Sequence, residues 1–266
     1  MPIRMLALDL DGTVLLPTRD PHPVSAAMIR AAHERGVRIV LASGRMTESV
    51  ARIREMIGVP AAIVGLNGAQ ASDHEGNVIL AQYVGDRATQ AIITLALETG
   101  VHISLYDEEG VRFAHDSVWG RRYTARVKGI DPRIYPEAEL RAGRYYKLLF
   151  ADDAKAIPEH RARAEALLDP KDVTLTESES EYLEFLPAGT DKGLGVAKVA
   201  EYYGIGANEV AAIGDYLNDL EMLRWVGVSG AMGNGHPDIL QAANFTVGTN
   251  EEGGVAQFIE QYVLQP

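Results

Sequence analysis

The chain of 266 residues contains no cysteine, which excludes disulfide bonds, thiolate zinc sites and a cysteine nucleophile. Positive charge is also scarce, because 25 lysine and arginine residues stand against 37 aspartate and glutamate residues, a net charge of −12. Nucleic-acid-binding proteins usually carry a basic surface, so we expect no nucleic-acid partner. An acidic protein that acts on phosphate esters must make its site locally positive with a metal ion, a lysine or helix N-termini.

Long apolar segments are absent as well. No stretch approaches the roughly 20 apolar residues that a membrane helix needs, and Asp9 interrupts the apolar start of the chain too early for a signal peptide. We therefore expect a cytoplasmic protein with no membrane partner. With 47% hydrophobic residues, the chain is long enough for one large α/β unit or for a core domain with a smaller second one.

Short aliphatic runs alternate with helical patterns at both ends of the chain. Strands are predicted over residues 3–8, 37–42, 62–65, 210–213, 226–228 and 244–247. Helices are predicted over residues 24–35, 46–57, 192–203, 217–225 and 255–263. Apolar strands that alternate with helices indicate an α/β fold with a parallel sheet covered on both faces.

The middle of the chain has a different pattern, in which helical segments mix with alternating strands. The helices are predicted over residues 88–97 and 157–168, and the strands over 102–106, 111–115, 147–151, 173–176 and 182–186. Strands and helices on a separate sheet suggest an α+β domain inserted into the first. We predict a core domain of residues 1–83 and 187–266, and an inserted domain of residues 84–186.

The segment DLDGT at residues 9–13 directly follows the first predicted strand. Asp9 and Asp11 would project from the same side of an extended chain. Two like charges at such a short distance are unfavourable unless a cation lies between them or one carboxyl stays protonated. Gly12 then allows a turn that a side chain would obstruct. We interpret the segment as a nucleophile and a proton carrier at a metal-centred phosphate site; a turn with solvated acids is the alternative.

Two further clusters lie where predicted strands end or helices begin, the place where ligands bind in open parallel sheets. Ser43, Gly44 and Arg45 combine a hydroxyl, a glycine and a helix N-terminus, which is typical of an anion cradle. Taken alone, Ser43 is better explained as a plain N-cap. Lys192 lies in the first turn of a predicted helix, where a cation opposes the helix dipole. A residue that departs from a local rule in this way is a candidate for a functional role. The alternative is a lysine whose side chain extends to water.

The segment GDYLND at residues 214–219 follows the strand predicted over residues 210–213. Asp215 ends that strand, so it can point at the site that Asp9 opens. Asp219 lies in the first turn of a helix, where an acid is stabilising without any further role. Oxygen ligands from separate carboxylates suit Mg²⁺ better than a transition metal.

These four segments, in this order, resemble the four motifs of the haloacid dehalogenase superfamily. The insertion between the second and third motifs is similar to that of the Cof-type phosphatases, as are LASGR at residues 41–45, NGA at 67–69, KLLF at 147–150 and AMGN at 231–234. The resemblance covers the whole chain. It implies a Rossmann-like core with a parallel sheet and an inserted α+β cap that selects the substrate.

The resemblance also implies roles for the acidic residues. Asp9 would attack phosphorus and form an aspartyl-phosphate, while Asp11 would protonate the leaving alcohol and then deprotonate the hydrolytic water. Mg²⁺ would be held by the side chains of Asp9 and Asp215 and by the backbone carbonyl of Asp11. Asp219 would lie behind these ligands or bind the metal through water.

The remaining motif residues would bind the phosphoryl group and the substrate. Ser43, with Gly44 beside it, and Lys192 would hold the phosphoryl oxygens, and Asn218 would support them. Arg45 would lie close enough to contact the substrate. Metal and lysine together would offset the charge on the equatorial oxygens.

The function expected from this resemblance is Mg²⁺-dependent hydrolysis of small phosphorylated metabolites, with sugar phosphates as the first guess. One alternative is a phosphomutase or another phosphotransferase, and a second is a protein that binds a phosphorylated metabolite without turnover. The proton carrier Asp11 argues against a pure binder. We expect a monomer or a small homo-oligomer, and one sequence does not reveal which cap residues select the substrate.

Overall fold

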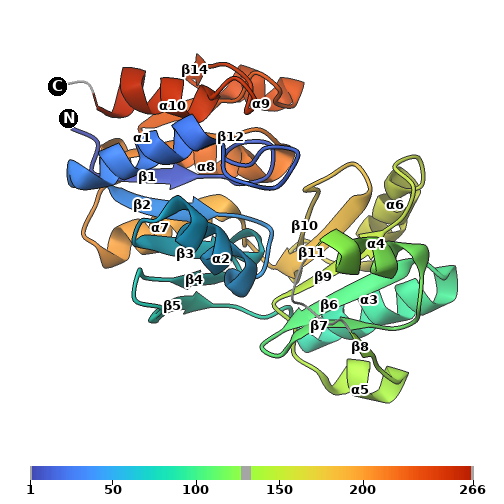
Figure 1. The fold of residues 1–266 in the computed structure, drawn as a ribbon. Coiled ribbons are helices and arrows are strands. Elements are labelled where there is room, and N and C mark those ends of the chain that lie inside the picture. The colour runs from blue at the N-terminus through green and yellow to red at the C-terminus, as the bar shows by residue number, and fades with distance from the viewer. Residues whose placement is uncertain (1, 127–132, 265–266) are drawn as a thin grey trace. The chain divides into compact units, whose positions relative to one another are not determined.

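The computed structural model describes residues 2–126 and 133–264, which form two compact units (Figure 1). The first unit comprises Met1–Ala81 and Asp191–Pro266, and the second comprises Gln82–Thr190. The sequence predicted that the inserted unit begins at residue 84 and ends at residue 186. In the structure it begins two residues earlier, at Gln82, and ends four residues later, at Thr190. Within the described ranges, no helix has both the length and the apolar character needed to cross a membrane.

The first unit is built on a sheet of eight strands in the order β14-β13-β12-β1-β2-β3-β4-β5. The strands are β1 (Met5–Leu8), β2 (Arg38–Ala42), β3 (Ala61–Gly65), β4 (Gln70–Ser72), β5 (Val78–Ala81), β12 (Val210–Gly214), β13 (Val228–Ala231) and β14 (Phe245–Thr246). Neighbours from β14 to β3 run parallel. The predicted α/β class is confirmed.

The hairpin of β4 and β5 extends the expected parallel sheet beyond β3. Both strands pair antiparallel at one edge of the sheet. A parallel partner for β3 would need a crossover of a dozen or more residues, whereas antiparallel strands need only a short turn. Residues 66–69 and 73–77 supply only such short connections.

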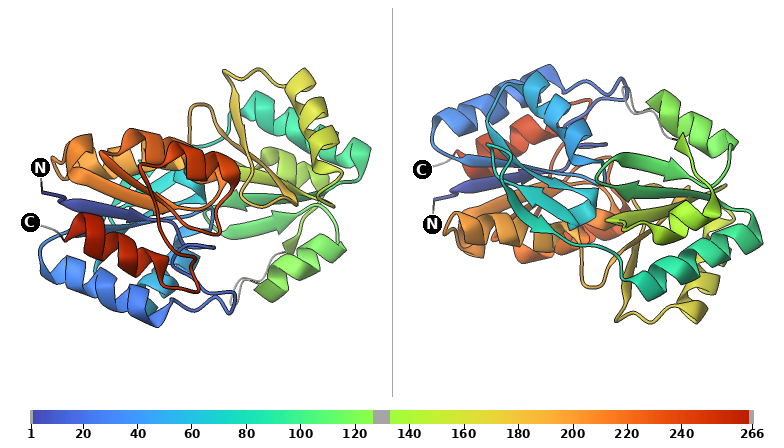
Figure 2. Two further views of the ribbon diagram at one scale, coloured as in Figure 1. Left: turned by 90° about the horizontal axis from the view of Figure 1, so that it is seen from above. Right: turned by 90° about the horizontal axis from the view of Figure 1, so that it is seen from below.

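Helices cover both faces of this sheet, as Figure 2 shows. One face packs against α1 (Pro23–Glu34), α2 (Thr47–Ile57) and α10 (Gly254–Phe258), and the other against α7 (Lys192–Tyr202), α8 (Leu220–Trp225) and α9 (Pro237–Ala242). Alternation along β1 divides the two cores, because Leu6 and Leu8 join the first and Met5 and Ala7 the second. All four are fully buried.

Several element boundaries differ from the predicted ones. The helix expected over residues 217–225 is a 3₁₀ turn, η3 (Leu217–Asp219), followed by α8. The strand expected at residues 226–228 begins only at Val228. The last helix ends in a wider turn, η4 (Ile259–Val263). Helix α9 has six residues, too few for a periodic pattern, and was not predicted.

The second unit contains a separate sheet of six strands in the order β10-β11-β9-β6-β7-β8. The strands are β6 (His102–Asp107), β7 (Gly110–Phe113), β8 (Arg133–Ile134), β9 (Lys147–Ala151), β10 (Val173–Thr176) and β11 (Tyr182–Pro187). All pairs are antiparallel except β7 with β8. The helices are α3 (Asp86–Thr99), α4 (Val118–Arg126), α5 (Glu137–Ala142) and α6 (Ile157–Leu167). The α+β character expected for the inserted segment is present.

The two faces of the second sheet differ in chemistry. Leu148 and Phe185 belong to the apolar core that includes residues of α3 and α6. Their neighbours Lys147 and Glu184 point the other way and form a buried ion pair, with 3.2 Å between Nζ and Oε2. The ammonium of Lys147 also lies 4.6 Å from the ring centre of Tyr106. The inserted unit therefore carries a polar face as well as an apolar one.

Gly68, at the end of η1 (Leu66–Gly68), lets the start of α7 approach β3. Its φ is +97°, and a Cβ there would lie 2.0 Å from the Asp191 carbonyl oxygen. Gly36, beyond α1, has a similar φ of +86° with nothing within 4 Å of that position. Of these two glycines, Gly68 therefore combines an unusual backbone conformation with a close contact, whereas Gly36 has the conformation alone.

We expect Gly68→Ala to destabilise the protein more than the matched control Gly36→Ala. The control carries only the penalty of a left-handed alanine, about 1–2 kcal/mol. Gly68→Ala adds an overpacking cost of about 1–3 kcal/mol. Urea denaturation of the unaltered protein and the two variants measures how much free energy of unfolding each variant loses. Equal losses would contradict the role assigned to the close contact.

Candidate active site

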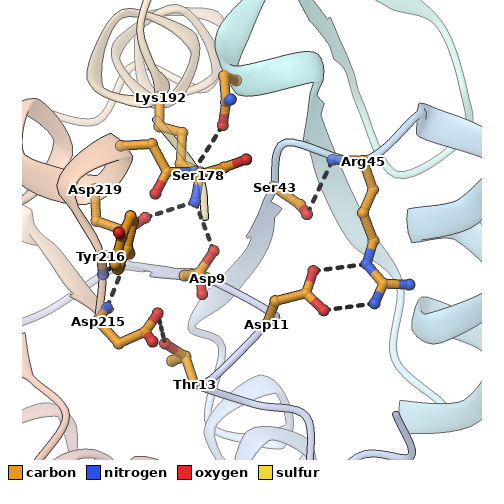
Figure 3. A network of polar contacts seen from close by, with 12 residues as sticks. Asp9, Asp11, Thr13, Ser43, Arg45, Ser178, Lys192, Asp215, Tyr216 and Asp219 are labelled. Carbon is orange, nitrogen blue, oxygen red and sulfur yellow. Dashed lines mark hydrogen bonds and ion pairs between the residues drawn. The ribbon is translucent and has the colours of Figure 1, made fainter. Parts of the chain in front are cut away.

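The candidate residues gather where the carboxyl ends of the central parallel strands meet. Asp9 follows β1, Ser43 follows β2, and Asp215 follows β12. These three strands are neighbours in the order β12-β1-β2, so segments that are far apart in the sequence lie side by side. Figure 3 shows their side chains directed toward one another.

Lys192 reaches the same place as the first residue of α7. Asp191 caps this helix, since its side chain accepts a hydrogen bond of 2.8 Å from the Leu194 backbone N–H. Two glycines bring the helix close to its neighbours: a Cβ on Gly195 would lie 2.4 Å from a Val64 methyl group, and one on Gly193 would lie 2.8 Å from the backbone of α8. Close packing of α7 thus directs its first side chain inward.

The Lys192 ammonium lies between two carboxylates. Nζ is 2.6 Å from Asp9 Oδ1 and 2.6 Å from Asp219 Oδ1, and the side chain is only 1% exposed (Figure 3). Burial alone would lower the pKa of Lys192, but the charges of Asp219 and Asp9 outweigh it and raise that pKa. The lysine is therefore a fixed cation in the site, and the alternative of a lysine that reaches water is wrong.

Asp9, Asp215 and Asp219 form a cluster that could hold a metal ion, because one oxygen from each lies within 4.8 Å of the others. Burial and the charge of Asp219 raise the pKa of Asp9 to about 7, even with Lys192 beside it. Burial and the charges of Asp9 and Asp219 raise the pKa of Asp215 to about 9. Asp9 Oδ2 is buried without a hydrogen-bond partner among the described residues. Crowded carboxylates with such an oxygen fit a hard divalent cation.

Asp11 has a different partner from Asp9. The strand ends at Leu8, and the Arg45 guanidinium binds Asp11 through two parallel hydrogen bonds, Nε to Oδ2 at 2.7 Å and Nη2 to Oδ1 at 2.5 Å (Figure 3). Withdrawal from water would raise the pKa of Asp11, but Arg45 outweighs this effect and lowers it. The two carboxylates thus do not share one cation through their side chains.

The segment that contains Ser43 and Gly44 forms a tight turn before α2. The Ser43 hydroxyl accepts a hydrogen bond of 3.2 Å from the Arg45 backbone N–H. Helix α2 begins only at Thr47, with Met46 at the N-cap, so Ser43 is not the N-cap of this helix. Ser43 is 1% exposed, and its hydroxyl proton can still be donated to an anion.

The structure brings Asn218 next to a residue that was not predicted for the site. Asn218 Nδ2 donates a hydrogen bond of 2.9 Å to Asn67 Oδ1. Asn67 follows β3, and the NG dipeptide after a predicted strand was the signal for it in the sequence. Thr13 was also missed; its hydroxyl donates to Asp215 Oδ1 at 3.3 Å.

Comparison with known proteins identifies the family. A family model described as haloacid dehalogenase-like hydrolase matches residues 6–259. The chain belongs to this family. Its resemblance to the superfamily, and the prediction of an enzyme of the superfamily's phosphatase class, are confirmed.

Relatives match over nearly the whole chain. The 5-amino-6-(5-phospho-D-ribitylamino)uracil phosphatase YwtE of Bacillus subtilis (strain 168) is 28% identical, over 97% of this chain and 98% of its own length. The putative phosphatase YxeH of the same organism is 30% identical, over 98% of both chains. The crystal structure of a haloacid dehalogenase-like hydrolase from Bacteroides thetaiotaomicron is 25% identical and superposes with a TM-score of 0.83, over 97% of this chain and 99% of that one.

We expect the affinity for Mg²⁺ to rise with pH between 6 and 9. The raised pKa values of Asp9 and Asp215, about 7 and about 9, mean that both carboxyls hold protons at pH 6 in the metal-free protein. A bound cation must displace them, so affinity should rise by up to about tenfold per pH unit for each proton released. Titration calorimetry at several pH values measures the change.

Asp215→Asn is the control for this titration, since it removes one titrating ligand and should abolish tight binding at every pH. The exposed Asp20 offers a matched change outside the cluster, and Asp20→Asn should behave like the unaltered protein. An affinity for Mg²⁺ that is independent of pH would rule out this cluster as the binding site.

Proposed function

We propose that the protein is a Mg²⁺-dependent phosphatase that hydrolyses small phosphorylated metabolites through an aspartyl-phosphate on Asp9. The observation that carries this proposal is the buried ion pair of Asp9 with Lys192, next to Asp215 and Asp219. The protonated Lys192 offsets the negative charge of a phosphoryl group that approaches Asp9. Asp9 Oδ2, which has no described partner, is then available to attack phosphorus. Family membership supports the same chemistry.

Asp9 is the proposed nucleophile because its carboxylate is fixed in place. A carboxylate oxygen of Asp9 bonds to phosphorus while the bond from phosphorus to the leaving alcohol breaks. Lys192 and the Ser43 hydroxyl stabilise the phosphoryl oxygens as their charge develops, and Asn218 supports them. The turn at Gly44 keeps the backbone of this loop close to the phosphoryl group. Water then attacks phosphorus, and Asp9 is released as carboxylate.

Asp11 is the proposed acid and base, and its pairing with Arg45 bears on both tasks. While Arg45 binds it, Asp11 is ionised and able to accept a proton from the attacking water. An anionic substrate competes for the Arg45 guanidinium. Withdrawal of Arg45 raises the pKa of Asp11, so the carboxyl can hold the proton that the leaving alcohol needs. Substrate binding is in this way linked to the protonation of the acid.

The side chains of Asp9 and Asp215 and the backbone carbonyl of Asp11 would hold Mg²⁺, which when bound neutralises charge on the phosphoryl oxygens. Asp219 has both oxygens engaged by the protein. Oδ1 accepts from Lys192, and Oδ2 accepts from the backbone N–H groups of Asp215 and Tyr216 at 2.9 and 3.1 Å. We therefore assign Asp219 to the orientation of Lys192 and of the Asp215 loop.

For the substrate we propose phosphorylated sugars or phosphorylated sugar alcohols. The name of the relative YwtE describes a substrate with a phosphorylated ribityl chain, which is a phosphate ester on a polyhydroxylated carbon chain.

Asp9→Asn should abolish phosphate release while the fold stays intact. The amide is no nucleophile, so we expect a loss of at least about 1,000-fold in kcat. Asp20→Asn should retain full activity. The measurement is phosphate release from p-nitrophenyl phosphate with Mg²⁺, with circular dichroism as the check on folding. Substantial activity in Asp9→Asn would refute the proposed intermediate.

A panel of about one hundred phosphorylated metabolites should show preference for phosphate esters of sugars and sugar alcohols over nucleotides and aromatic esters. The ratio of kcat/KM values between substrates is the relevant quantity. Free phosphate is the expected product. An isomerised sugar phosphate, detected by phosphorus NMR, would instead show a phosphomutase.

A further inference from the structure

Two consecutive residues after β3 have an unusual backbone conformation. Leu66 and Asn67 have φ values of 50° and 53°, in the left-handed region, and neither is glycine. Among the described non-glycine residues only Arg19 shares a positive φ. Left-handed backbone is unfavourable for residues other than glycine, and residues held in this way cluster at functional sites.

Backbone hydrogen bonds tie this strained turn to the loop after β2. Leu66 N–H donates to the Arg45 carbonyl at 2.9 Å, and Asn67 N–H donates to the Ser43 carbonyl at 3.0 Å. Any residue could make these two bonds through its backbone. They explain why the turn is held in place, but they do not explain why its second residue is asparagine.

The side chain of Asn67 supplies that explanation. It is 1% exposed, and its Oδ1 accepts the hydrogen bond of 2.9 Å from Asn218 Nδ2. Its amide atoms also lie 3.1 Å from the position where a Cβ on Gly44 would stand. One buried amide thus binds Asn218 and leaves little room for a side chain at Gly44.

Asparagine satisfies the two demands of this position together. It tolerates the left-handed region better than other side chains, and its carbonyl oxygen can accept a hydrogen bond inside the protein. Glycine would satisfy the backbone alone. The accepted bond also decides how the Asn218 amide faces, because Nδ2 turns toward Asn67 and the Asn218 oxygen turns away from it.

We propose that Asn67 is a positioning residue that fixes Asn218 and the Ser43–Gly44 loop in the arrangement that binds the phosphoryl group. This inference rests on the proposed phosphatase function for the identity of the ligand. Asn67 acts through its neighbours, so its loss should weaken binding of phosphate and turnover together without unfolding the protein.

The test is Asn67→Gly, which removes the amide and also relieves the left-handed strain. We expect its thermal midpoint to equal or exceed that of the unaltered protein. We expect kcat/KM for p-nitrophenyl phosphate to fall about 10- to 100-fold, since small misplacements of binding groups have effects of this size. Calorimetry with inorganic phosphate and Mg²⁺ should show weaker binding.

Asn77→Gly is the matched control. Asn77 also uses its side-chain amide inside the first unit, but its partner is Asp73 in the β4–β5 turn. It should leave kcat/KM and phosphate binding unchanged. If Asn67→Gly also leaves both unchanged, the asparagine serves only the backbone and the inference is overturned.

Coupling with Asn218 separates positioning from a general structural role. If Asn67 acts partly through Asn218, the double variant Asn67→Gly with Asn218→Ala should lose less activity than the two single losses combined predict. Additive losses would overturn the inference, even if Asn67→Gly proves less stable than expected.

The unaltered protein distinguishes the two proposals. If it is active and Asn67→Gly is equally active, only the inference about Asn67 fails. If it neither releases nor binds phosphate with Mg²⁺, the proposed function fails, and the positioning role falls with it.

Discussion

The Lys192 ammonium is the contact on which the arrangement of the site depends. It is buried between Asp9 and Asp219, 2.6 Å from an oxygen of each. Without this cation the two carboxylates would be like charges buried without a counter-ion. Burial of an unpaired ion costs several kcal/mol, roughly, for each ion. The glycines of α7 that let it pack closely against β3 and α8 therefore also serve the electrostatics of the site.

Burial and charge pairing also give Asp9 and Asp11 different properties, although they lie two residues apart in the chain. Burial and Asp219 raise the pKa of Asp9, whereas Arg45 lowers the pKa of Asp11. Pairs of groups whose surroundings move their pKa values in opposite directions are typical of sites that divide the tasks of catalysis. Here the division follows from where the strand ends: Asp9 is enclosed next to β1, and Asp11 lies beyond it in contact with the next loop.

Much of this was readable from the sequence, for a physical reason. Asp9, Ser43 and Asp215 follow aliphatic runs, and strands of this kind are buried and parallel, so their carboxyl ends must meet. The bidentate contact of Arg45 with Asp11 and the hydrogen bond of Asn218 to Asn67 could not be read in this way, since each joins loops whose paths depend on tertiary packing. A short element such as α9 could not be predicted, because six residues are too few for a periodic signal.

The order of strands in the first sheet has a consequence for synthesis of the chain. Strand β1 pairs on one side with β2 and on the other with β12, which lies about two hundred residues later. All six strands of the second unit are translated before β12 appears. A ribosome therefore delivers a complete inserted unit while the central strand of the first still has an open edge, and an open edge invites wrong pairing. The late return of β12 and α7 closes that edge and supplies Lys192 in the same step.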